Sequence, residues 1–350
     1  MNLVVLHTLL FVGAGCTGNP SAPEVPVSAS EAPLQKAVDA WRNQGAVSGH
    51  FRAQSDAGVL MGRMARGQTN VLHITRGTFA YNPPDQFRVI GEQSAEFVGT
   101  EEPRRAAGSI DVLFNQRTLT MVSQSPAGIP GAPRVHRVGS DLFDESNPFK
   151  LKTLLNGSPF GQGDVAESVD AVMKSATFTG QQAVTEDGET LTAYIGVIDP
   201  AERIEAMVAE KSPGIAALLQ SRKSELADRV FPVQLQATAE TLMAQRHVRV
   251  LLDSEGWIRG WDAGPAQGRM AVSMRLNKLR RSVEKDAFIL DTSLEAQAVD
   301  QTPALVAQHE ALDKTFADTA AVAEVKAELL AAVRTLEAEE AKGEKPSGKP

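Results

Sequence analysis

Hydrophobic and polar residues alternate with a period of two along much of the first half of the chain. In 109–115, Ile110, Val112 and Phe114 point to one side, and Asp111, Leu113 and Asn115 point to the other. Turn residues such as Asp56-Ala57-Gly58 bound several such segments. The pattern predicts an antiparallel sheet with one packed face and one wetter face. The predicted strands are 47–53, 59–65, 71–81, 86–91, 109–115 and 118–123.

A second group of strands follows after residue 175. Segments 176–183 and 190–198 flank Glu186-Asp187-Gly188-Glu189, whose Asp-Gly pair predicts a hairpin turn. In the second segment Leu191, Ala193, Ile195 and Val197 share one face. Further strands are predicted at 233–237, 247–253, 257–262 and 270–279. The last has the clearest alternation, which puts Met270, Val272, Met274 and Leu276 on one apolar face.

Helical spacing appears between and around the strands. Leu34, Val38 and Trp41 lie at i, i+4 and i+7, which predicts a starting helix. Short helices are expected at 147–155 and 165–173, and a longer helical stretch at 200–229. Ser212-Pro213 divides that stretch, as an N-cap and first helical residue would. The predicted class is therefore α+β: a large, curved antiparallel sheet covered by short helices.

A helical extension follows residue 300. Narrow apolar stripes run through an Ala/Glu-rich background, which predicts helices that lie outside the barrel core or against a partner. The charged segment 337–350 is expected to be disordered. The stripe residues are Leu305, Leu312, Phe316, Val322, Val325, Leu329 and Leu336.

The N-terminal end carries an apolar run with no Asp, Glu, Lys or Arg. Leu3 to Val12 is shorter than the roughly 20 residues that span a bilayer, and it is typical of a secretion signal. Gly13-Ala14-Gly15-Cys16 then resembles the lipobox of bacterial lipoproteins, which implies that Cys16 is lipidated. The alternative is a plain cleaved signal or a misplaced start codon, with an incidental cysteine. A Pro/Ser/Ala-rich tether in 17–33 suits a lipid-anchored domain.

Four segments result: the signal and lipobox in 1–16, the tether in 17–33, the main α+β domain in 34–299 and the extension in 300–350. The net charge of −8 and the 5% aromatic content of the 350 residues disfavour nucleic acid as a partner. Arg275, Lys278, Arg280 and Arg281 form a basic cluster, either a solvated rim or a contact for lipid head groups.

The sequence lacks the motifs of the common catalytic sites. It has no Walker-type phosphate loop and no Gly-x-Ser-x-Gly elbow. Its six histidines are scattered, without the spacing of zinc ligands, so no metal site and no cofactor is expected. These observations favour a protein that is not an enzyme.

The order of elements resembles the LolA-like carrier superfamily, and within it the LppX/LprG-type lipid-binding lipoproteins. The resemblance covers roughly 34–291. It rests on Asn147-Pro148-Phe149-Lys150-Leu151-Lys152-Thr153-Leu154-Leu155, Ala176-Thr177-Phe178-Thr179-Gly180, Asp187-Gly188, Tyr194-Ile195-Gly196-Val197 and Val248-Arg249-Val250-Leu251-Leu252-Asp253 with Gly256-Trp257-Ile258.

This resemblance implies a half-open barrel whose apolar concave side holds acyl chains. We expect an extracytoplasmic, lipid-anchored protein of the cell envelope that binds a lipid or acylated molecule and takes part in its transport or sorting. The alternative is an envelope scaffold with a filled core that binds a protein partner through its C-terminal helices. The expected cavity residues are Met270, Val272, Met274, Leu276, Ile110, Val112, Phe114, Leu191 and Ile195. The expected lid residues are Phe149, Leu151, Leu154 and Leu155.

Overall fold

The structure is a computed structural model that describes residues 31–56, 59, 71–82, 86–97, 105–115, 118–125, 134–139, 165–265 and 269–342. The strands are β1 (Val47–Asp56), β2 (Val71–Asn82), β3 (Gln86–Phe97), β4 (Arg105–Asn115), β5 (Thr118–Gln124), β6 (Arg134–Val138), β7 (Ala176–Glu186), β8 (Glu189–Ile198), β9 (His247–Leu252), β10 (Ile258–Gly264), β11 (Val272–Arg280) and β12 (Val299–Asp300). The helices are α1 (Ala32–Asn43), α4 (Val165–Ser175), α5 (Pro200–Ala209), α6 (Pro213–Arg222), α7 (Ala227–Ala244), α8 (Thr292–Glu295), α9 (Thr302–Phe316) and α10 (Thr319–Ala341).

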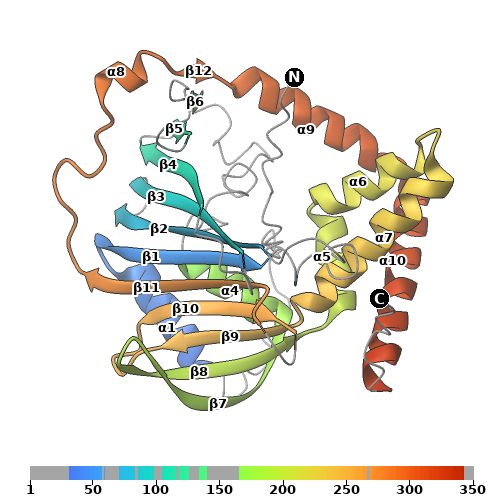
Figure 1. Ribbon diagram of the computed structural model, residues 1–350, viewed down its shortest axis with the longest axis horizontal. Coiled ribbons are helices and arrows are strands. Elements are labelled where there is room, and N and C mark those ends of the chain that lie inside the picture. The colour runs from blue at the N-terminus through green and yellow to red at the C-terminus, as the bar shows by residue number, and fades with distance from the viewer. Residues whose placement is uncertain are drawn as a thin grey trace.

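The described strands form one curved, open sheet of twelve strands (Figure 1). Its order is β12-β6-β5-β4-β3-β2-β1-β11-β10-β9-β8-β7. Neighbouring strands are antiparallel except β12 and β6, which run parallel. The two predicted groups of strands join where β1 pairs with β11. The predicted α+β class with a large, unclosed antiparallel sheet is confirmed.

The β7–β8 hairpin follows the sequence prediction closely. Glu186 pairs with Glu189, and Asp187 and Gly188 make the turn with φ of 50° and 82°. Both values lie in the left-handed region, which Asp and Gly tolerate better than other residues. The Asp-Gly pair therefore fixes the register of the two strands.

Other elements differ from the prediction. The prediction of a strand at 233–237 is wrong, because this segment lies inside α7. Leu235, Ala239 and Leu242 of this helix pack together with other helices. Strands β6 and β12 were not predicted, because they have only five and two residues and are too short to show an alternating pattern. The segment 59–65 lies outside the described residues apart from position 59.

The larger core lies on one face of the sheet, which we call the inner face; the opposite one is the outer face. Leu34, Val38 and Trp41 of α1 are buried there, at most 2% exposed, as their helical spacing predicted. Trp41 meets the ring of Trp257 edge to face at 5.6 Å between centroids. Helix α4 packs beside α1, so both helices cover the sheet near β7 and β10.

A second core lies among the helices α5, α6, α7, α9 and α10. The side chains of Ile204, Ile215, Leu218 and Leu219 have no exposed surface. The predicted cap is confirmed: Ser212 Oγ accepts a hydrogen bond from the backbone N–H of Ile215 at 3.3 Å. This layer stands at one end of the strands (Figure 1).

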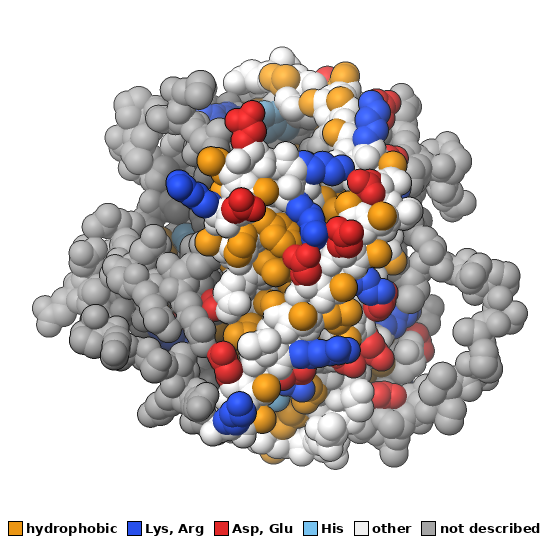
Figure 2. Space-filling view, turned by 90° about the vertical axis from the view of Figure 1, so that its right-hand side faces the viewer, with side chains coloured by type: hydrophobic (Ala, Val, Ile, Leu, Met, Phe, Trp, Pro, Cys, Tyr) orange, Lys and Arg blue, Asp and Glu red, His pale blue; other side chains and the backbone are white. Residues whose placement is uncertain are grey.

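Helix α10 packs mainly on α5, α6 and α7. Its Val325, Leu329 and Val333 are at most 2% exposed, so its apolar stripe is used within the chain. Ion pairs such as Arg222–Glu328 at 2.8 Å border the contact, and charged side chains surround apolar ones on this face (Figure 2). The helix extends to Ala341, so the expectation of disorder from residue 337 is wrong for 337–341.

Candidate functional site

The inner face of β1 to β5 is a continuous apolar surface. Directly paired residues of antiparallel strands lie on the same face, so the pairing defines transverse rows. Two such rows are Val47, Tyr81, Phe87, Phe114 and Leu119, and then Phe79, Val89, Val112 and Met121. The rings of Phe87 and Phe114 stack at 5.7 Å. Tyr81 and Met121 are half-buried, whereas the other residues of these two rows are at most 8% exposed.

Two glycines occupy the third row, between Phe51 and Ile110. A Cβ atom on Gly91 would lie 3.1 Å from Cζ of Phe51, so this ring packs directly over the glycine backbone. A Cβ atom on Gly77 would lie 1.8 Å from the carbonyl oxygen of Ile90, which leaves no room for any side chain. The row therefore lets an aromatic ring from β1 reach across two neighbouring strands.

Most of the predicted cavity residues share this inner face. Val272, Met274 and Leu276 are each 2% exposed, and Val112 and Phe114 are 5% and 8% exposed. All five belong to the main core, and the half-buried Ile110 lies on the same face. Val272, Met274 and Leu276 pack on the half of the sheet that α1 and α4 cover.

Two of the predicted cavity residues, both in β8, lie on the outer face. Leu191 packs in a small cluster with Ala193 and Leu251, and Ile195 pairs with Arg249, which contacts the outer-face Asp262. Strand β8 is apolar on both sides, so alternation alone could not show which set faces inward.

The expectation that Met270 shares a face with Val272 is wrong. β11 begins only at Val272, and Met270 lines an outer-face cavity with Asp56, Arg269 and Ser273. The alternation of residue types extends two residues beyond the strand itself, which is why the sequence misplaced this side chain.

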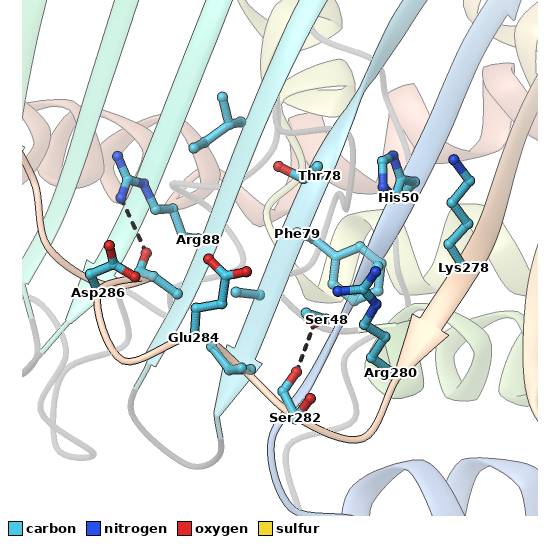
Figure 3. Close-up of a pocket in the computed structure, with 15 residues that line it drawn as sticks. Ser48, His50, Thr78, Phe79, Arg88, Lys278, Arg280, Ser282, Glu284 and Asp286 are labelled. Carbon is cyan, nitrogen blue, oxygen red and sulfur yellow. Dashed lines mark hydrogen bonds between the residues drawn. The ribbon is translucent and has the colours of Figure 1, made fainter.

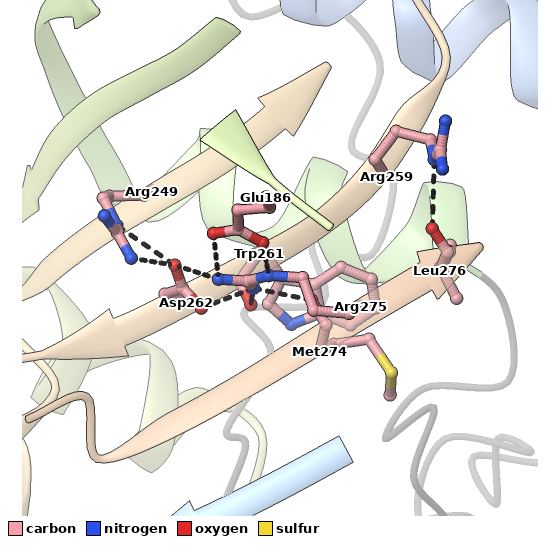
Figure 4. A network of polar contacts seen from close by, with 8 residues as sticks. All are labelled: Glu186, Arg249, Arg259, Trp261, Asp262, Met274, Arg275 and Leu276. Atoms are coloured by element: carbon pink, nitrogen blue, oxygen red, sulfur yellow. Dashed lines mark hydrogen bonds and ion pairs between the residues drawn. The ribbon is translucent and has the colours of Figure 1, made fainter. Parts of the chain in front are cut away.

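A buried polar network ties the outer side of β7, β9, β10 and β11 together (Figure 4). The carboxylate of Asp262 has no exposed surface and accepts hydrogen bonds from Arg249 at 2.6 Å and Arg275 at 2.6 Å. Arg275 also donates to Glu186, at 2.9 Å from its Nη2. Burial alone would lower the pKa of Arg275, but hydrogen bonds and charges from Asp262 and Glu186 together raise it. The network is internally satisfied, which favours a structural role.

A segment that we call the strap, Arg281–Ala298, crosses the outer face from β11 towards β6. Phe288, Leu290 and Leu294 pack on Leu113 and Val135 of the sheet. The hydrogen bond of Arg88 with Asp111 is the main cause of the raised pKa of Arg88. The guanidinium of Arg88 also donates to the carbonyls of Ala287 and Ile289 at 3.2 and 2.8 Å. The sequence did not reveal the strap, because its apolar residues follow neither the period of two of a strand nor the period of 3.6 of a helix.

Several predicted sites lie outside the described residues. They are the lipidation site Cys16 and the lid residues Phe149, Leu151, Leu154 and Leu155. Both stay predictions. Within the described ranges, no helix has the length and apolar content to cross a bilayer, and no three His, Cys, Asp or Glu side chains meet as a metal-binding group.

Comparisons with known proteins give a limited result. No protein-family model matches the chain, and no curated protein does. Among solved structures, the chain is similar to a DUF1329 family protein from Desulfovibrio piger, with 9% identity and a TM-score of 0.28 over 77% of this chain and 99% of that one. A similarity at this level carries no conclusion about function.

Proposed function

We propose that this protein is a lipid-anchored envelope lipoprotein, without enzymatic activity, that binds a lipid or acylated molecule and takes part in its transport or sorting. The observation that supports the proposal best is the apolar inner face of β1 to β5, with its half-buried Tyr81, Ile110 and Met121. An acyl chain gains about 0.8 kcal/mol for each CH₂ group that leaves water. A surface of aromatic, aliphatic and methionine side chains suits such a flexible ligand.

The scaffold alternative has less support. It requires the apolar stripe in 305–336 to bind a partner, but Val325, Leu329 and Val333 already pack against α5, α6 and α7. A partner would have to replace those contacts or use other surfaces. The ligand proposal needs no such rearrangement.

The direct test is organic-solvent extraction of the purified full-length protein, followed by lipid mass spectrometry. We expect a stoichiometric amount of one lipid class that is absent from a control protein purified in the same way. A protein that yields no lipid, and takes up none from vesicles of its host's lipids, would contradict the proposal.

Two isoleucines provide a matched pair of variants. Ile110 lies half-buried on the inner face, whereas Ile90 lies on the outer face and is 43% exposed. We expect Ile110→Gln to reduce the bound lipid about tenfold, since an amide in an apolar site costs about 1–3 kcal/mol. Ile90→Gln should leave the lipid content unchanged. Equal lipid in both variants, with both folded by circular dichroism, would argue against this face as the site.

Anchoring is tested separately at Cys16. Two or more acyl chains on this cysteine would hold the protein firmly on a membrane. We expect the wild type in the membrane fraction and Cys16→Ser in the soluble fraction, with the same bound ligand. A soluble wild-type protein whose mature chain begins elsewhere would refute lipidation without affecting the ligand proposal.

A further inference from the structure

The strap and the sheet enclose a cavity on the outer face (Figure 3). Ser48 Oγ donates a hydrogen bond to the carbonyl of Ser282 at 2.7 Å, which holds one end of the strap. A second attachment of the strap is made by Arg88, which donates hydrogen bonds to the carbonyls of Ala287 and Ile289. Between these two attachments, Val283, Glu284 and Asp286 form a wall opposite β1, β2 and β11. The cavity is partly open to solvent, and its volume of about 450 Å³ is enough for a small polar ligand.

A β-bulge directs two cationic side chains into this cavity. Strict alternation after Val272, Met274 and Leu276 would put Lys278 and Arg280 on the inner face. The pairing of β11 with β1 shifts between Ser48 and His50, and Arg280 pairs with the outer-face Ser48. Lys278 takes up the shift with a φ of 50°. Left-handed backbone is unfavourable for lysine, and bulges with such strain often re-aim side chains at functional sites.

The two walls of the cavity carry opposite charges (Figure 3). Lys278 and Arg280 stand on the strand side, where His50 adds a ring N–H donor. Glu284 and Asp286 stand on the strap side. Within the described chain no ion pair joins the two walls. The guanidinium of Arg88 also lines the cavity; its ion pair is with Asp111, at 2.7 Å, and it also interacts electrostatically with Asp286, so Glu284 carries most of the free negative charge of the strap side.

We propose that this cavity binds a small zwitterion, with a phosphate group at Lys278 and Arg280 and an ammonium group at Glu284 and Asp286. Two cationic side chains with a further donor match the charge of a phosphate, roughly −1.5 to −2, better than that of a carboxylate. The attachments of the strap keep the opposite charges apart, so a ligand with both charges can bridge them. The charged side chains of the site lie on the other face from the acyl-chain surface, so the proposal does not depend on the proposed function.

The test is calorimetric titration of the full-length protein with phosphoethanolamine, inorganic phosphate and ethanolamine. We expect phosphoethanolamine to bind at least fivefold more tightly than either fragment. The proposal would be overturned if inorganic phosphate bound as tightly as phosphoethanolamine. It would also be overturned if none of the three compounds gave heat at millimolar concentrations.

Three substitutions separate the two ends of the ligand. Arg280→Gln should weaken both phosphoethanolamine and phosphate about twofold to fivefold, as exposed charge pairs contribute up to about 1 kcal/mol. Glu284→Gln should weaken phosphoethanolamine but strengthen inorganic phosphate. Arg52→Gln, at an exposed arginine on the same face that does not line the cavity, is the control and should change neither. If Glu284→Gln leaves the affinity for phosphoethanolamine unchanged, the ligand is not held as a zwitterion.

The same chemistry occurs in a free metabolite and in a lipid head group. The Cys16→Ser protein, which lacks the proposed anchor, can be mixed with vesicles that contain phosphatidylethanolamine and with vesicles that contain only phosphatidylglycerol. Selective binding to the first, reversed by phosphoethanolamine, supports the proposal with a head group as the source. Binding of soluble phosphoethanolamine alone supports it with a free ligand as the source.

Discussion

Arg203 is a charged residue inside the helical layer, and its surroundings make it costly. Burial lowers its pKa from the usual value to about 10, although the charge of Glu210 acts in the opposite direction. Its guanidinium donates to Oε1 of Gln245 at 2.8 Å, while its Nε has no hydrogen-bond partner. A neutral amide is thus the acceptor for a buried cation.

The pair of Arg203 and Gln245 can be tested by a double-mutant cycle. Gln245→Leu should lower the free energy of unfolding by about 3 kcal/mol, because it leaves a buried charge without an acceptor. Arg203→Met should cost less, about 1–2 kcal/mol, since it leaves only a neutral amide unpaired. The double variant should be close to wild type. Urea denaturation measures all four proteins, and additive losses would contradict the coupling.

At the scale of the element, the two glycines in β2 and β7 give a matched comparison. Gly77→Ala would put a methyl group 1.8 Å from the carbonyl of Ile90, so we expect a loss of roughly 1–3 kcal/mol in stability. A Cβ atom on Gly180 would meet nothing within 4 Å, so Gly180→Ala should be neutral or gain about 0.4–1 kcal/mol. Thermal unfolding measures the stability of both variants. Equal changes in stability would show that the close contact at Gly77 does not restrict the side chain there.

The elements with a strong period could be predicted from the sequence, and the others could not. α1, the β7–β8 hairpin and the Ser212 cap each depend on local patterns, so their positions follow from neighbouring residues. The strap and the Lys278 bulge depend on contacts with residues far away in the chain. The inner-face set was predicted in part: alternation grouped Val272 with Met274, but it could not assign Leu191 to a face.

At the scale of the whole molecule, helix α9 connects the two cores. Its Leu305 packs against the main core and its Phe316 belongs to the second one. Helix α10 then covers Ile204, Leu218 and Leu219 from α5 and α6. The helical layer is thus built from two segments that are far apart in the sequence.

Removal of 300–350 should therefore expose the apolar side chains of α5 to α7. We expect the truncated protein to bind the dye ANS and to lose protection from hydrogen exchange in 200–244, while β1 to β5 remain protected. A chain that ends at Lys342 keeps α10 and serves as the control. Full protection of 200–244 in the shorter chain would show that α10 is dispensable for this layer.

The open sheet also has consequences for how the protein behaves at high concentration. An unclosed sheet has two edge strands, whose free backbone groups invite pairing with another copy. At one edge, β6 is covered by the short parallel strand β12, whose Val299 and Asp300 pair with His136 and Arg137. At the other, the bulge between Phe178 and Gly180 interrupts the regular ladder of β7. Such interruptions are a known defence against edge-to-edge aggregation, so we expect the protein to stay dispersed at high concentration.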